Sequence, residues 1–130
     1  MVANGYARSV KSYRDNSVLS MSPGELVVAL FDECIKDISF AKEHIKNKNY
    51  QERFNCLSKA IKIMEYMTAS LDMKIPISEE LAQLYEYYIW AFNQVNVTNS
   101  IEHIDDLIIM ITDVRDGFKG AAAKVAAGQG

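Results

Sequence analysis

The side chains that most often carry out catalysis or hold metals are few in this chain. Its two histidines, His44 and His103, have no Glu three residues before them, so the Glu-x-x-His pairs of di-iron helical bundles are absent from the sequence. His103 lies among Glu102, Asp105 and Asp106, in the predicted first turn of a helix, where the helix dipole favours solvated carboxylates; a metal site is the alternative. We expect no bound metal, no cofactor and no enzymatic activity.

The two cysteines, Cys34 and Cys56, are predicted to be free thiols in a hydrophobic core. A turn expected near residue 48 would offset them by about 10 Å along two paired helices, which is beyond the reach of a disulfide. Free thiols are typical of a reducing compartment, and the first twenty residues lack the apolar region of a signal peptide. These features indicate a cytoplasmic protein.

The composition argues against two other classes of protein. Of the 130 residues, 49% are hydrophobic and 24% are charged, which is the balance of one globular domain. The net charge is −3, and residues 75–130 carry three basic and eight acidic side chains. The sequence therefore does not indicate a basic surface for binding nucleic acid. No segment approaches the roughly 20 apolar residues of a membrane-spanning helix, so membrane insertion is not expected.

Helix start and stop signals divide the chain into four long helices within a single domain, 1–130. Each predicted helix begins at a Ser or Asn that can cap it and has a Glu in its first turn. Pro76 ends the second helix, because the residue before a proline is pushed out of the α region. The predicted helices cover 22–47, 49–73, 78–97 and 99–120, with caps at Ser22, Asn49, Ser78 and Asn99, an N-terminal segment at 1–21 and a frayed tail at 121–130.

Apolar side chains recur at intervals of three and four along each predicted helix, as in bundles that bury one stripe of each helix. In the second helix the predicted stripe consists of Phe54, Leu57, Ile61, Met64, Thr68 and Leu71. The connections are short, which forces consecutive helices to be antiparallel. The sequence therefore predicts an all-α fold, an antiparallel up-down-up-down four-helix bundle with the short N-terminal segment docked on it.

The chain has more apolar surface than a four-helix core needs. Residues 107–111 are apolar all round the fourth helix, so something outside the core must cover Ile109 or Met110. Tyr87 and Trp90 lie off the stripe of the third helix; they mark a partner contact or pack on a loop or on the N-terminal segment. This surplus suggests a hydrophobic groove for a partner helix.

Further candidates for the groove come from the second helix and from the N-terminal segment. Met64 and Met67 belong either to the groove or to the core, since methionine adapts to both environments. Apolar side chains spaced four and three apart line one face of the N-terminal segment, which is too short to be a stable helix alone. The predicted partner-binding residues are Tyr6, Val10, Tyr13, Met64, Met67, Tyr87, Trp90, Ile109 and Met110.

Several short motifs follow one another along residues 6–119. They are Tyr13-Arg14-Asp15-Asn16-Ser17-Val18, Ser22-Pro23-Gly24-Glu25-Leu26, Leu30-Phe31-Asp32, Leu84-Tyr85-Glu86-Tyr87, Val95-Asn96 and Val114-Arg115-Asp116-Gly117-Phe118. In this order and spacing they resemble the motifs of the flagellin-specific secretion chaperones, the FliS family. The main departure is Phe118, which stands where the family has Trp.

The resemblance implies a four-helix bundle that binds the disordered C-terminal segment of flagellin in the cytosol. Binding would prevent premature polymerisation and present the client to the flagellar export apparatus, a type III secretion system. The resemblance also implies that the N-terminal segment lies against the bundle and moves when the client binds. A co-chaperone and a weak homodimer stay open as further partners. The alternative is a homo-oligomeric structural or adaptor module with no flagellin client.

Overall fold

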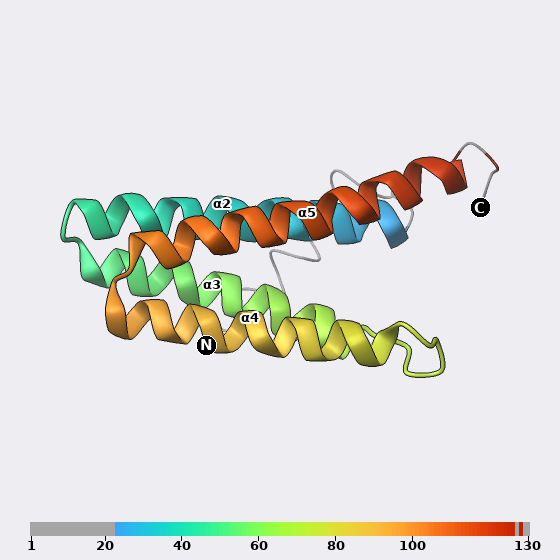
Figure 1. Cartoon of the computed structure of the whole chain (residues 1–130), viewed down its shortest axis with the longest axis horizontal. Helices are drawn as coiled ribbons and strands as arrows, with labels where there is room; N and C mark the ends of the chain where they lie inside the picture. The colour runs from blue at the N-terminus through green and yellow to red at the C-terminus, as the bar shows by residue number, and fades with distance from the viewer. Residues whose placement is uncertain (1–22, 127, 129–130) are drawn as a thin grey trace.

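The computed structural model describes residues 23–126 and residue 128, and this part of the chain is all-α (Figure 1). Its helices are α2 (Pro23–Lys46), α3 (Tyr50–Ala69), α4 (Ser78–Thr98) and α5 (Ile101–Ala126). Consecutive helices run antiparallel and are joined by short connections, so the predicted up-down-up-down bundle is confirmed. The predicted docking of residues 1–21 lies outside the described residues.

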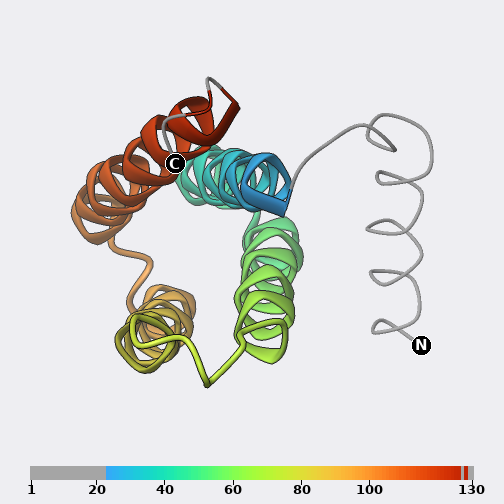
Figure 2. The ribbon, with the colours of Figure 1, turned by 90° about the vertical axis from the view of Figure 1, so that its right-hand side faces the viewer.

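The four helices do not contact one another equally. α2 packs along both α3 and α5, and α3 packs along α4, whereas α4 and α5 make few direct contacts although they follow each other in the chain. Viewed from the end, the backbones of α4 and α5 are well apart over most of their length (Figure 2). The bundle is therefore less closely packed on the side formed by α4 and α5.

The contacts of α5 with α2 explain which neighbour this helix takes. Lys42 on α2 forms an ion pair with Asp105 on α5 at 2.6 Å, and Arg115 on α5 donates a hydrogen bond to Asp32 on α2 at 2.8 Å. α4 offers no such cation, since residues 78–98 contain three Glu and no Lys or Arg. Pairs of opposite charge thus join α5 to α2, and among the described residues no ion pair joins α5 to α4.

One hydrophobic core joins the four helices, and large aromatic side chains fill much of it. Phe31, Tyr85, Tyr88 and Phe92 are almost fully buried, and the rings of Phe31 and Tyr85 meet edge to face at 6.1 Å. Such pairs stabilise a core beyond the area they bury. The buried residues of α3 are Cys56, Leu57, Ala60, Ile63, Met64 and Met67.

This core face of α3 is rotated from the predicted stripe, which was wrong at several positions. Phe54 and Thr68 are exposed and Ile61 is half-buried, while Ala60 and Ile63 are inside. The reason is that residues spaced three and four apart occur on two overlapping faces of this helix. The neighbouring helices α2 and α4 select the face that holds the small residue Ala60, which allows close approach.

Two helix ends and one cap differ from the predicted ones. α3 ends at Ala69, before residue 73, where the hydroxyls of Thr68 and Ser70 donate to carbonyls four residues back. Ser78 does not cap α4, because its hydroxyl donates a hydrogen bond to the carbonyl of Asp72. This bond fixes the loop that precedes α4. α5 continues past residue 120 to Ala126, over an alanine-rich stretch with high helix propensity.

The connection between α4 and α5 also corrects a predicted cap. Asn99 does not begin α5; it ends α4 in the left-handed conformation, with φ 55°. The hydroxyl of Ser100 takes the capping role and accepts a hydrogen bond from the backbone N–H of His103 at 3.1 Å. This two-residue connection places the end of α4 beside the start of α5.

Candidate interaction surface

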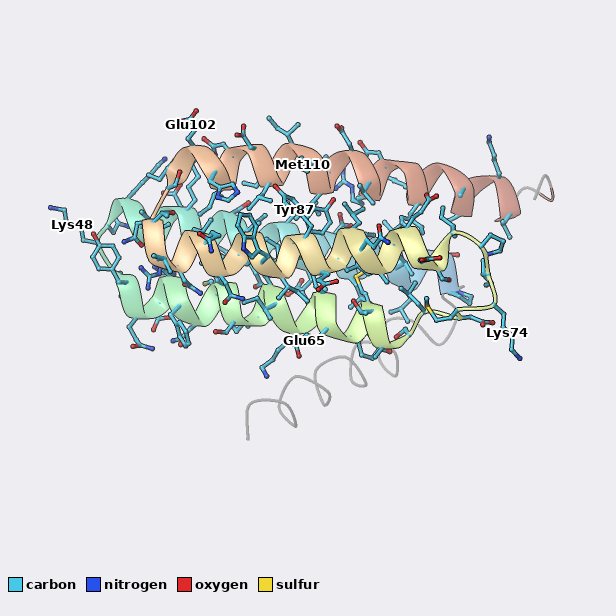
Figure 3. All side chains as sticks on the ribbon, turned by 60° about the horizontal axis from the view of Figure 1, so that its bottom comes forward. Lys48, Glu65, Lys74, Tyr87, Glu102 and Met110 are labelled. Carbon is cyan, nitrogen blue, oxygen red and sulfur yellow. The ribbon has the colours of Figure 1, made fainter. Side chains whose placement is uncertain are left out.

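Four large apolar side chains are exposed on α4 and α5, and we call them the α4–α5 face: Tyr87, Trp90, Ile109 and Met110. They are 40%, 54%, 62% and 39% exposed, respectively. All four were predicted from the sequence as partner-binding residues. Figure 3 shows Tyr87 on α4 and Met110 on α5 on the same side of the molecule, between the two helices.

The direction of Met110 follows from the contacts on the opposite side of α5. Asp105 and Arg115 point toward α2, which they reach through ion pairs. Met110 lies on the other flank of the helix at 100° per residue, so it points toward α4. Ile109 is one residue back and lies further out on the solvent side. Met110 thus forms the part of the α5 edge nearest α4, and Ile109, one turn after Asp105, forms the outer rim of this edge.

On α4 the two aromatic residues of the face support each other. Tyr87 and Trp90 are one helical turn apart, and their ring centroids are separated by 6.0 Å. The ring of Tyr87 also lies 6.0 Å from that of the buried Tyr88. The exposed aromatic surface is therefore continuous with the core, which limits how far these side chains can move. Fixed aromatic side chains are typical of protein-binding surfaces.

The remaining predicted candidates have other positions. Met64 and Met67 are buried in the core, which is the second of the two environments considered for them, and they line no accessible surface in this arrangement. They fill the space between α3 and its neighbours, the more common use of a core methionine. Tyr6, Val10 and Tyr13 lie outside the described residues.

A second group of exposed apolar side chains was not predicted. Met73, Ile75 and Ile77 are more than half exposed in the connection between α3 and α4. The sequence around them could have indicated their exposure, because these apolar residues alternate with Lys74 and Pro76 in a connection between two predicted helices. They are at the end of the bundle away from the α4–α5 connection, as Figure 1 shows. They are therefore separate from the centre of the α4–α5 face.

The side chains that could do chemistry are buried or dispersed. Cys34 and Cys56 are free and buried, as predicted, and burial raises the pKa of both thiols, which keeps them protonated and unreactive. Among the described residues, no three His, Cys, Asp or Glu side chains are grouped as metal ligands. Within the same part of the chain, no helix is long and apolar enough to cross a membrane.

One buried carboxylate has no ion-pair partner within the described part of the chain. Asp37 on α2 is 8% exposed, and no ion pair to another described residue reaches it. Burial, followed by the nearby charge of Glu33, raises the pKa of Asp37 to about 7, although Lys59 and Lys36 oppose this shift. Asp37 lies among the core residues of α2, away from the α4–α5 face, so its effect is on stability.

A helical bundle that exposes an aromatic and apolar face supported by its core is typical of proteins that bind other proteins. The comparisons with known proteins agree with this class. The profile of the family described as "Flagellar protein FliS" matches residues 6–125, and the chain belongs to this family. It is a family of flagellar secretion chaperones.

Two curated relatives and one solved structure illustrate the similarity. The flagellar secretion chaperone FliS of Bacillus subtilis is 30% identical over 110 residues, which cover 85% of this chain and 83% of the relative. That of Salmonella typhimurium is 26% identical over 127 residues, 92% of this chain and 94% of the relative. A crystal structure of a bacterial flagellar chaperone has the same fold, with a TM-score of 0.75 and 21% identity over 91% of this chain and 98% of that chain.

Proposed function

We propose that this protein is a cytosolic export chaperone that binds the disordered C-terminal segment of flagellin. Bound flagellin cannot polymerise early and is delivered to the flagellar export apparatus. The protein acts by binding and catalyses no reaction. Membership of the FliS family supports the flagellar role, and the exposed α4–α5 face supports binding of an apolar segment.

The observation that carries this proposal is the exposure of Tyr87, Trp90, Ile109 and Met110 on one side of the bundle. Apolar area on this scale favours burial against another molecule, at about 25 cal/mol for each Å² removed from water. A disordered segment gains this energy by folding as an amphipathic helix along the face, with anchors at intervals of three and four residues. The client supplies the helix contact that α4 and α5 do not make with each other.

Self-association is a weaker explanation of the same face. Two copies paired through their α4–α5 faces would bring Asp106 and Asp113 of each copy toward the same carboxylates of the other. Both carboxylates are exposed, and neither forms an ion pair within the described part of the chain. Bringing like charges together costs free energy in a surface that loses water. A client of different charge avoids this cost.

In this proposal the N-terminal segment covers part of the same face in the free protein. Tyr6, Val10 and Tyr13 have the spacing of helix anchors but form a face of only about two turns. Such a short segment is displaced easily by a longer client. Deletion of residues 1–18 should increase the binding of a hydrophobic dye and change client affinity; no change in either would remove the segment from the binding site.

The test of the proposed function compares two aspartate variants on α5. Ile109 and Val125 are almost equally exposed, at 62% and 63%, but only Ile109 belongs to the α4–α5 face. A flagellin C-terminal peptide is titrated into each variant while the fluorescence of Trp90, the only tryptophan, is recorded. Thermal melting of each variant is measured alongside to separate binding from folding.

Ile109→Asp should weaken peptide binding by at least about a hundredfold, because a carboxylate without a partner would have to lose its water on binding. Val125→Asp should bind as the wild type does. Both proteins should remain folded, since an outward carboxylate stays hydrated in the free state. Wild-type affinity in a well-folded Ile109→Asp protein would exclude this face as the client site.

A further inference from the structure

We propose that the helix bound on the α4–α5 face carries Lys or Arg along the edges of its apolar stripe. This inference rests on the proposed function and adds the charge of the bound segment. Its basis is the charge of the two helices that frame the face. From residue 75 to residue 114 the chain has seven Asp or Glu side chains and no Lys or Arg.

The carboxylates lie next to the exposed apolar side chains of α5. Asp106 lies three residues before Ile109 and four before Met110. Asp113 lies four residues after Ile109 and three after Met110. These are the intervals at which helix side chains are neighbours, so each apolar residue has a carboxylate one turn before it and one turn after it. The α5 edge of the face is therefore apolar in the middle and acidic at both ends.

These two carboxylates are available to a partner. Asp106 and Asp113 are exposed, and no hydrogen bond or ion pair joins either to another described side chain. The neighbouring Asp105 differs, because it is paired with Lys42 of α2. The contrast follows from the direction of each side chain, since Asp105 is on the α2 side of α5 and Asp106 on the α4 side.

The opposite edge of the face adds no positive charge. Along α4 the polar residues one turn from Tyr87 and Trp90 are Gln83, Glu86, Asn93 and Gln94. The basic residues of α5 follow Val114, and they are Arg115, Lys119 and Lys124. The other basic residues of the helices and of the first turn are on the α2–α3 side: Lys36, Lys42, Lys46, Lys48, Arg53, Lys59 and Lys62. A bound helix would therefore lie between one acidic edge and one neutral to acidic edge.

Charge complementarity selects one kind of occupant for this face. A helix with acidic edges would add like charges to a surface that loses water, whereas Lys or Arg edges would pair with Asp106 and Asp113. These pairs would lie at the rim and would remain partly hydrated. Their contribution should therefore decrease as salt screens the charges. The apolar anchors would supply the part of the affinity that does not depend on salt.

The experiment uses the full chain and three synthetic peptides of about 18 residues, each able to form a helix about 27 Å long. All three have the same leucine stripe, contain no tryptophan, and carry either Lys, Gln or Glu along both edges of the stripe. Binding is followed by Trp90 fluorescence at about 0.02 M and about 0.5 M salt, where the Debye length falls from above 20 Å to below 5 Å.

At low salt the Lys peptide should bind at least about tenfold more tightly than the Gln peptide, and the Glu peptide more weakly than either. High salt should bring the three affinities together. The double variant Asp106→Asn with Asp113→Asn should remove the advantage of the Lys peptide and leave the affinity of the Gln peptide unchanged. Glu52→Gln with Glu65→Gln, which neutralises two exposed carboxylates of α3, is the matched control and should keep the advantage.

Two results would overturn the inference, and they differ in what they say about the proposed function. Equal affinity for the three peptides at low salt would show that an apolar segment binds without regard to its charge, so only the inference would fail. If none of the peptides changes Trp90 fluorescence and the chain sediments as a dimer, a second copy covers the face. The inference and the proposed function of the face would then fail together.

Discussion

The rings of Phe31 on α2 and Phe118 on α5 lie 5.5 Å apart, within contact distance of two aromatic side chains. Phe31 is fully buried and also contacts Tyr85 of α4, so it links the two helices that make few contacts with each other. The ion pair between Asp32 and Arg115 is close to the Phe31–Phe118 contact. Asp32 follows Phe31 directly on α2, and Arg115 precedes Phe118 by three residues on α5. Together these contacts fix the second half of α5 on the bundle.

Phe118→Ala should destabilise the protein by about 2 kcal/mol, because it removes the aromatic contact and leaves a cavity next to Phe31. Urea unfolding followed by circular dichroism measures this loss. Val125→Ala, further along α5 at an exposed position, is the control and should be nearly neutral. An equally small effect of both substitutions would show that the end of α5 is not held by the Phe31–Phe118 contact.

Asp37 should make the protein less stable as the pH rises from about 4 to about 7. Its ordinary pKa is 3.8, and burial raises the pKa of the folded state to about 7. Between these values the folded state binds a proton that the unfolded state does not, so the free energy of unfolding falls as the pH rises. Above pH 7 the full cost of the buried charge is present.

Asp37→Asn should remove this part of the pH dependence and stabilise the protein at pH 8 by at least about 1 kcal/mol. At pH 4 the variant and the wild type should have similar stabilities. Thermal melts between pH 4 and pH 8 test both statements, with Glu65→Gln at an exposed position as the control. Parallel pH profiles for Asp37→Asn and the wild type would contradict the prediction.

Tyr88→Phe should stabilise the free protein by about 1 kcal/mol. The side chain is fully buried, and its hydroxyl has no hydrogen-bond partner among the described residues. An unsatisfied buried hydroxyl costs free energy, whereas the phenylalanine ring keeps the same shape. Chemical denaturation measures the change, with Tyr50→Phe at an exposed position as the control. A loss of stability would show that the hydroxyl has a partner in solution.

Gly117→Ala should also stabilise the protein, by about 0.5–1 kcal/mol, because glycine is unfavourable inside a helix. A Cβ atom at this position would meet nothing within 4 Å, so the added methyl group causes no clash. Chemical denaturation measures the change, and an unchanged or lower free energy of unfolding would contradict the prediction.

Between residues 23 and 126 the sequence alone determined the number, type and order of the helices, because the signals for them are local. Apolar residues three and four apart define a helix face, and Pro76 excludes a helix across the connection between α3 and α4. The exposure of Ile109 and Met110 was also determined locally. Five consecutive apolar residues surround a helix, and a bundle covers only one side of it.

Only the tertiary structure decided which helices touch and which apolar residues are enclosed. The positions of Met64 and Met67 along the sequence fit either a groove or the core. The helices packed against α3 place both side chains in the core. The position of α5 beside α2 depends on pairs such as Lys42 and Asp105, which are far apart in the chain. Local periodicity sets which side chains share a face, but the partner of that face is set by charge and shape complementarity between distant segments.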